Sequence, residues 1–77
     1  DIADLAASYG VALAKNHAFV DGNKRVAFLA LGLFLAVNGF RLHTNQVDAT
    51  LTMLGVAAGD IDEASFAAWI RAHIQAR

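Results

Sequence analysis

Residues 17–25, which read HAFVDGNKR, are the segment of this 77-residue chain whose residue types could do chemistry. Lys24 and Arg25 open a long apolar run, which predicts a helix beginning there, and Gly22 and Asn23 directly precede them. A helix N-terminus carries unpaired N–H groups and a partial positive charge, so two cations are unfavourable there. A bound anion removes this conflict, because the N–H groups, the helix dipole and both cations attract it. The segment is therefore a candidate phosphate-binding loop.

A simpler structural explanation fits the same residues. Asp-Gly is a common turn dipeptide, Asn23 is a suitable helix cap, and Lys24 and Arg25 can extend into water. The helix-terminus argument by itself therefore leaves both anion binding and a solvated helix start open. An EF-hand calcium loop is excluded, because its spacing of acidic residues and its closing Glu are absent.

His17 and Asp21 add reactive groups to this loop. A lone histidine at a helix end is more often a cap than a catalyst, but this spacing lets His17 and the loop face one ligand. Asp21 would repel phosphates unless Mg²⁺, which prefers oxygen ligands, lay between them. The aromatic side chain of Phe19 is expected to anchor the loop in the core. Together these residues predict a base, a metal ligand and an anion site, as phosphoryl or nucleotidyl transfer requires.

Helices are expected to position this loop, and the absence of proline permits helix nearly everywhere. Residues 24–38 are apolar all round, which predicts a central, buried helix that ends at Asn38-Gly39. Apolar residues at helical spacing predict an earlier helix over residues 2–15. Its expected buried stripe is Ile2, Leu5, Ala6, Tyr9 and Leu13.

The second half of the chain predicts two more helices, which makes the fold class all-α with about four helices. Residues 41–44 are expected to be a short extended link, followed by Thr44 or Asn45 as a helix cap. The third helix is expected to end at Gly59, and Asp62 to cap the last helix. The expected buried stripe of the third helix is Val47, Leu51, Leu54 and Ala58. The expected buried face of the last helix is Phe66, Trp69, Ile70, His73 and Ile74.

Composition limits the class of protein. The chain forms at most one domain, yet 57% of its residues are apolar, against a usual ~45–50%. We therefore expect either a dense core or an apolar face that packs on something else, and the first residue, Asp1, suggests a truncated chain. A net charge of −1 without a basic run argues against nucleic-acid binding.

The longest apolar run, 26–37, is too short to cross a membrane, which takes ~20 residues. The absence of cysteine is typical of a reducing compartment.

The loop segment resembles the Fic motif, His-x-Phe-x-(Asp/Glu/Ala)-(Gly/Ala)-Asn-(Gly/Lys)-Arg, and seven of its positions match. The likeness continues through Asn38-Gly39-Phe40 and through Gly59-Asp60-Ile61 before the last helix. This resemblance identifies the whole chain, residues 1–77, as the C-terminal portion of a single Fic/Doc domain. The fold that this implies is a Fic-type helical bundle, with an anion-binding loop at the N-terminus of its central buried helix.

The resemblance also implies a role for each residue of the motif. His17 would deprotonate the attacking hydroxyl of a target protein, Asp21 would hold Mg²⁺, and Phe19 would pack into the core. The phosphates of ATP would be bound by Gly22, Asn23, Lys24 and Arg25.

Two departures from the commonest form of the motif separate the kinds of chemistry. Adenylylating Fic enzymes typically have Gly where this chain has Lys24, and a second Arg where it has Phe28. The lysine variant resembles the Doc type, cytoplasmic toxins of toxin–antitoxin pairs. The resemblance implies transfer of the γ-phosphoryl group of ATP to a translation factor, elongation factor Tu, which stops protein synthesis. It also implies an antitoxin partner.

Two alternatives accompany this hypothesis. One is an adenylyltransferase, against which Lys24 and the absent second arginine count. The other is a catalytically silent helical module that binds an antitoxin or an identical chain, because a truncated domain would leave apolar faces uncovered.

Overall fold

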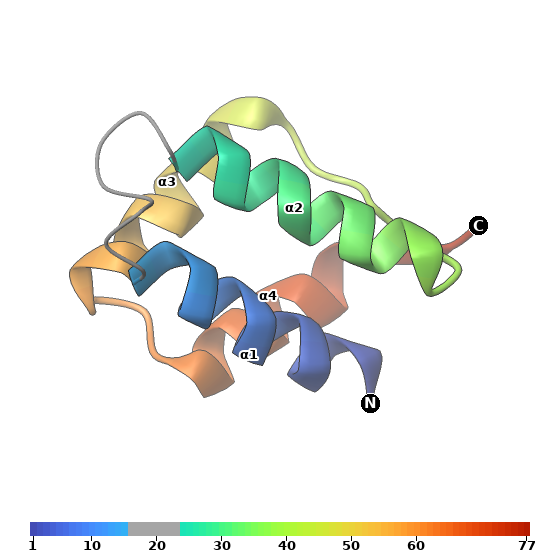
Figure 1. Ribbon diagram of the computed structural model, residues 1–77, viewed down its shortest axis with the longest axis horizontal. Helices are drawn as coiled ribbons and strands as arrows, with labels where there is room; N and C mark the ends of the chain where they lie inside the picture. The colour runs from blue at the N-terminus through green and yellow to red at the C-terminus, as the bar shows by residue number, and fades with distance from the viewer. Residues whose placement is uncertain (16–23) are drawn as a thin grey trace.

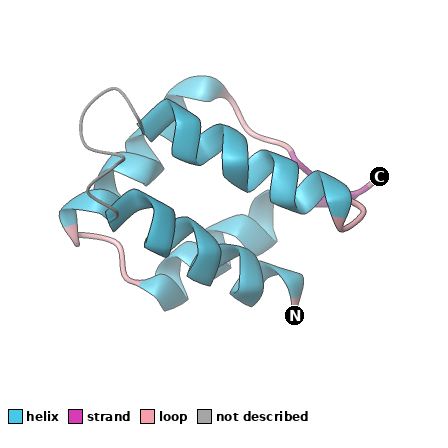
Figure 2. Cartoon of the chain, viewed as in Figure 1, coloured by secondary structure: helices cyan, strands magenta, loops and turns pink. Residues whose placement is uncertain are grey.

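A computed structural model describes residues 1–15 and 24–77 of the chain, with only the backbone described for residues 24–27. It is an array of helices with one short pair of strands, so the predicted all-α class is confirmed (Figures 1 and 2). In chain order the elements are α1 (Ile2–Lys15), α2 (Lys24–Val37), β1 (Phe40–Leu42), α3 (Gln46–Ala58), α4 (Glu63–His73) and β2 (Ile74–Ala76).

One core joins all the helices. α1 and α2 run side by side in opposite directions, and α4 also packs against the buried face of α1 (Figure 1). The ring of Tyr9 on α1 stacks on that of Phe34 on α2, with 5.1 Å between the ring centroids. The largest fully buried side chains are Phe66, Leu31, Leu35, Met53, Ile70 and Val56. Each contributes about 1.5–3 kcal/mol by leaving water, so this small set carries much of the stability.

The buried face of α1 agrees with the prediction only in part: Ala6 is fully buried, and Ile2 and Leu13 are partly buried against the core. Leu5 and Tyr9 are exposed, while small residues face the core, namely Ala3, Ala6, Ala7, Gly10 and Ala14. These residues repeat at the same helical spacing as the predicted stripe, so the sequence offers two apolar faces. The structure buries the face of smaller residues because they let α4 approach closely. A Cβ atom on Gly10 would lie only 2.7 Å from Cε2 of Phe66.

The buried face of α3 also differs from the prediction. Val47, Leu51, Leu54 and Ala58 are exposed. The residues that face the core are Ala49, Thr52, Met53 and Val56. Thr52 is accommodated there because its hydroxyl donates a hydrogen bond of 2.9 Å to the carbonyl oxygen of Asp48. The hydroxyl made this face look polar in sequence, although its hydrogen-bonding need is met within the helix.

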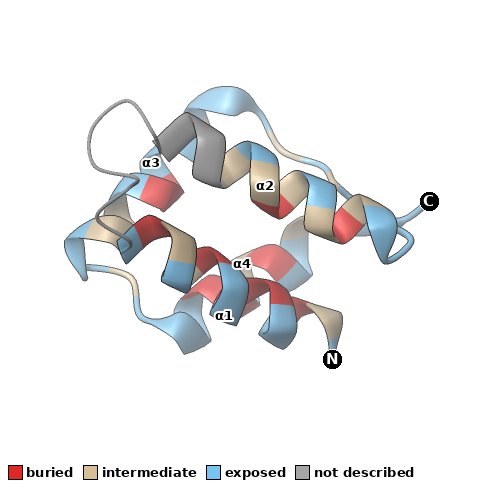
Figure 3. Cartoon of the chain, viewed as in Figure 1, coloured by how far each residue is buried: buried red, intermediate tan, exposed pale blue. Residues whose placement is uncertain are grey.

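α2 is buried on one side instead of being enclosed. Leu31 and Leu35 are fully buried, whereas Leu29, Leu33 and Val37 are 62%, 66% and 74% exposed. The exposed residues repeat every four positions and so form one stripe along the helix. Figure 3 shows exposed residues along the outward sides of α1 and α2. This exposed stripe on α2 is an apolar face that the chain does not cover itself, which is one of the two outcomes expected from the composition.

The predicted caps define the ends of the helices. The backbone N–H of Asp48 donates to Oδ1 of Asn45 at 2.7 Å, so Asn45, the second of the two predicted candidates, caps α3. Asp62 caps α4 in the same way. Gly39 and Gly59 have φ values of +86° and +83°, the left-handed conformation that ends a helix and favours glycine.

Among the described residues, the strand pair is the element that the sequence did not predict. β1 and β2 pair antiparallel, with Phe40 opposite Ala76 and Leu42 opposite Ile74. The last helix therefore ends at His73, one residue before the predicted face does. The first part of the link expected at 41–44 is a strand, β1, because residues of β2 satisfy its backbone hydrogen bonds.

Candidate functional site

The structure describes the two helices that flank the predicted loop. α2 begins at Lys24, as predicted, and Lys24 and Arg25 are its first two residues. The remaining predicted site residues lie outside the described part of the chain: His17, Phe19, Asp21, Gly22 and Asn23. The anion-binding loop therefore stays a prediction. The structure describes the helix pair on either side of it, α1 and α2, which we call the frame.

This frame is an antiparallel helix pair. The end of α1 and the start of α2 lie at the same end of the molecule (Figure 1). Packing fixes their separation, since Tyr9 stacks on Phe34 and a Cβ atom on Gly10 would lie 3.8 Å from Cδ1 of Leu31. Any ligand held between the helix ends would thus meet a partly positive helix N-terminus beside a partly negative helix C-terminus. Lys15 lies in the last turn of α1, and its positive charge suits the partly negative C-terminus of that helix.

The first turn of α2 is the electrostatic exception among the described helices. α1, α3 and α4 carry Asp4, Asp48 and Glu63 in their first turns, where an acidic side chain offsets the helix dipole. α2 has no acidic residue in its first turn. Its two cations and its N-terminal dipole have the same sign, which suits an anionic ligand.

The predicted magnesium ligand, Asp21, is untested by the described residues. Within residues 1–15 and 24–77, no group of three or more His, Cys, Asp or Glu side chains could hold a metal ion. Nε2 of His73 lies 3.8 Å from Oδ2 of Asp48. Its ring stacks on Trp69, with 4.5 Å between the centroids, and its Nδ1 lies 2.7 Å from the Trp69 carbonyl oxygen. These contacts make His73 a packing residue of α4.

Comparison with known proteins connects the frame to a family. A family model described as the Fic/DOC family matches residues 1–35, which include α1, the whole HAFVDGNKR segment and most of α2. The "Protein kinase doc" of Escherichia phage P1 is 39% identical over 71 residues, which cover 92% of this chain and 56% of that protein. The "Toxin Doc" of Mycolicibacterium smegmatis is 45% identical over 67 residues, which cover 84% of this chain and 52% of that protein.

The chain belongs to the Fic/DOC family. Both relatives match it beyond the range of the family model, so the likeness also includes residues of the second half of the chain. The chain spans about half the length of the curated relatives it matches. In this Fic/DOC chain the motif thus begins after α1 and ends in the first turn of α2.

The exposed apolar residues of α1, α2 and α3 described above agree with the predicted uncovered apolar face. A second surface was not predicted. It is a groove of about 370 Å³ between α2 and the strand pair, lined by Phe28, Gly32, Ala36, Phe40, Arg41, Leu42 and Arg77. The sequence signal for the groove was weak, because its residues come from three separate segments. The alternation of apolar Phe40 and Leu42 with Arg41 is the only local hint.

The described helices give no sign of a membrane span. Within residues 1–15 and 24–77, none is both long enough and apolar enough to cross a bilayer.

Proposed function

We propose that this chain is the part of a Doc-type toxin that carries its catalytic loop, and that it transfers a phosphoryl group from ATP to a hydroxyl of a target protein. The observation that carries the proposal is a complete Fic motif placed at the one described helix whose first turn is cationic. The name of one relative, a protein kinase, supports phosphoryl transfer, and the name of the other, a toxin, supports the assignment as a toxin.

His17 is the proposed general base. It takes the proton of the target hydroxyl, whose oxygen then attacks the γ-phosphorus of ATP. The bond from this phosphorus to the bridging oxygen breaks, and ADP leaves with that oxygen. The motif offers no other imidazole, so loss of His17 should abolish the reaction instead of redirecting it.

Residues 21–25 are proposed to hold the nucleotide. Gly22, Asn23, Lys24 and Arg25 bind its phosphates at the start of α2, where the helix dipole adds to the two side-chain charges. Asp21 has the hard oxygen ligands that suit Mg²⁺, and this ion would offset negative charge on the phosphates. Lys24 favours phosphoryl over adenylyl transfer, because its side chain fills space that glycine leaves open in adenylylating enzymes.

The proposed target is elongation factor Tu, whose phosphorylation would stop translation in the cytoplasm. The proposed partner is a cognate antitoxin. A partner is physically attractive because the stripe of Leu29, Leu33 and Val37 is exposed in this chain. The same stripe supports a second candidate function, a helical module that binds an antitoxin or a second copy without catalysis.

ATP labelled at either the γ-phosphate or the α-phosphate distinguishes these functions. The full-length protein is incubated with elongation factor Tu, Mg²⁺ and each labelled nucleotide. Incorporation of the γ-label alone is expected, and incorporation of the α-label would replace the proposal with adenylyl transfer. His17→Ala should abolish labelling, while His43→Ala, a change at an exposed histidine after β1, should preserve it. No labelling by the unmodified protein would leave the binding module as the better function.

A further inference from the structure

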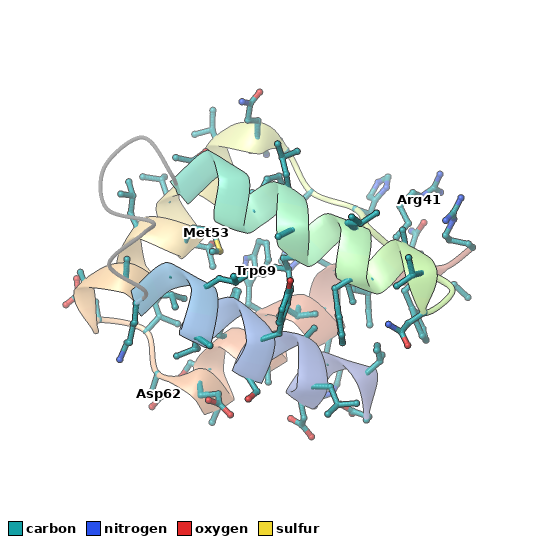
Figure 4. The ribbon with its side chains drawn as sticks, viewed as in Figure 1. Arg41, Met53, Asp62 and Trp69 are labelled. Carbon is teal, nitrogen blue, oxygen red and sulfur yellow. The ribbon has the colours of Figure 1, made fainter. Side chains whose placement is uncertain are left out.

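The groove between α2 and the strand pair combines an apolar floor with a charged rim. Phe28, Gly32 and Ala36 lie at four-residue spacing on one face of α2, and Phe40 and Leu42 of β1 lie opposite them. The rim is formed by Arg41 and Arg77. Figure 4 shows Arg41 at the end of the molecule where α2 ends and the C-terminus lies.

The two arginines carry charges that the described residues do not neutralise. Arg77 is held in place, since its Nη1 donates to the Ala36 carbonyl oxygen at 3.3 Å and its backbone N–H to that of Gly39 at 2.9 Å. Within the described parts of the chain, no Asp or Glu side chain lies within ion-pair distance of Arg77 or Arg41. Arg71 differs, because its guanidinium is bound by Asp1 and Asp4 at 3.1 and 3.3 Å.

β1 adds backbone groups to this surface. The hydrogen bonds from His43 N–H to the His73 carbonyl and from Arg77 N–H to the Gly39 carbonyl place residues 39, 41 and 43 in the hydrogen-bonded pairs with β2. The N–H and C=O groups of Phe40 and Leu42 therefore point to the opposite edge of β1. No other strand pairs with that edge among the described residues. Such an edge can accept an additional strand.

We propose that this groove binds an extended segment of a partner protein in which acidic and apolar residues alternate. Successive side chains of a strand point to opposite faces, so a strand added beside β1 would place every second residue near Phe40 and Leu42 and the others near Arg41. Apolar residues of the added strand would match Phe40 and Leu42, and its acidic residues would match Arg41. A nucleic acid is the poorer match, because two arginines beside an apolar floor make few phosphate contacts.

Fluorescence anisotropy of a short labelled peptide with alternating Glu and Leu residues tests this proposal on the full-length protein. Saturable binding is expected, and a matched peptide of alternating Lys and Leu should not bind. Replacing both rim arginines (Arg41→Glu with Arg77→Glu) should weaken binding about tenfold, which corresponds to roughly 1.4 kcal/mol. Arg71→Glu is the matched control and should leave the affinity unchanged.

Gly32→Phe provides an independent test of the groove itself. A Cβ atom on Gly32 meets no heavy atom within 4 Å, so the added ring can occupy the groove without a clash at its base. This variant should abolish peptide binding while its circular dichroism remains helical. Equal binding of the two peptides, equal loss in the Arg71→Glu control, or competition by single-stranded DNA would each overturn the proposal. The absence of any binding would overturn it too. The labelling assay for phosphoryl transfer is separate, so either proposal can fail alone.

Discussion

The contact between Gly10 and Phe66 can be tested with one substitution made at two helical glycines. Alanine in place of glycine within a helix gains about 0.8–1 kcal/mol, because glycine loses more backbone freedom on folding. At Gly32 the new methyl group meets nothing within 4 Å, so Gly32→Ala should stabilise the protein by about that amount. For a domain of this size, roughly 1 kcal/mol raises Tm by about 4–8 °C.

Gly10→Ala should have the opposite sign. The new Cβ atom would lie 2.7 Å from Cε2 and 3.3 Å from Cζ of Phe66. This ring is fully buried and stacked on Trp69, with 6.1 Å between centroids, so it cannot move aside freely. Overpacking of this kind costs about 1–3 kcal/mol. Since both variants share the gain in helix propensity, the difference in stability between Gly32→Ala and Gly10→Ala should itself be about 1–3 kcal/mol.

Urea denaturation gives the two free energies of unfolding. Trp69 is the sole tryptophan and lies near the middle of the bundle, so its fluorescence reports loss of the core (Figure 4). Phe66→Leu removes the ring atoms that Gly10→Ala would meet, and the double variant should therefore show a smaller penalty for alanine at position 10. The packing of α1 on α4 described here would be refuted if Gly10→Ala stabilised the protein as much as Gly32→Ala does.

Other predictions follow from burial, capping and backbone conformation. Leu35→Ala should destabilise the protein by about 2–5 kcal/mol, whereas Leu33→Ala, on the exposed side of the same helix, should change stability by less than about 0.5 kcal/mol in urea denaturation; equal losses would contradict the orientation of α2. Gly59→Ala should cost about 1–2 kcal/mol and lower Tm, because alanine disfavours the left-handed conformation that ends α3; an unchanged Tm would contradict that conformation. The N–H of Ser65 donates to Asp62, which lowers the pKa of this carboxyl below its usual value near 3.9. The stability it contributes should therefore be fully present above about pH 4 and be lost as the pH falls through the lowered pKa. Asp62→Asn keeps a capping oxygen but does not titrate, so its Tm should depend less on pH in this acidic range than that of the unmodified protein.

The ends of the elements could be predicted from sequence better than their faces. Asn45, Gly59 and Asp62 act through their own backbone and nearest neighbours, so local sequence determines these boundaries. The buried side of α1 depends on what packs against it. Gly10 faces inward because Phe66 occupies the space beside it, and no pattern within α1 contains that information.

The strand pair depends on residues that are distant in sequence, whereas the motif is made of consecutive residues, so only the motif could be predicted from sequence. β1 pairs with residues more than thirty positions later, and its three residues give too short a pattern to predict alone. The HAFVDGNKR segment was informative because its residues are consecutive and together match a family motif. The start of α2 at Lys24 agrees with that prediction.

The packing of α1 on α4 has a consequence for how the protein is made. Among the described helices α1 comes first in the chain and α4 comes last, and the ring of Phe66 on α4 fills the space beside Gly10 on α1. A nascent chain that has not yet reached α4 therefore lacks the largest side chain of its core and exposes the small residues of α1 to water. α1 and α2 can pair early, since they are close in sequence, but this core is complete only after α4 has been synthesised.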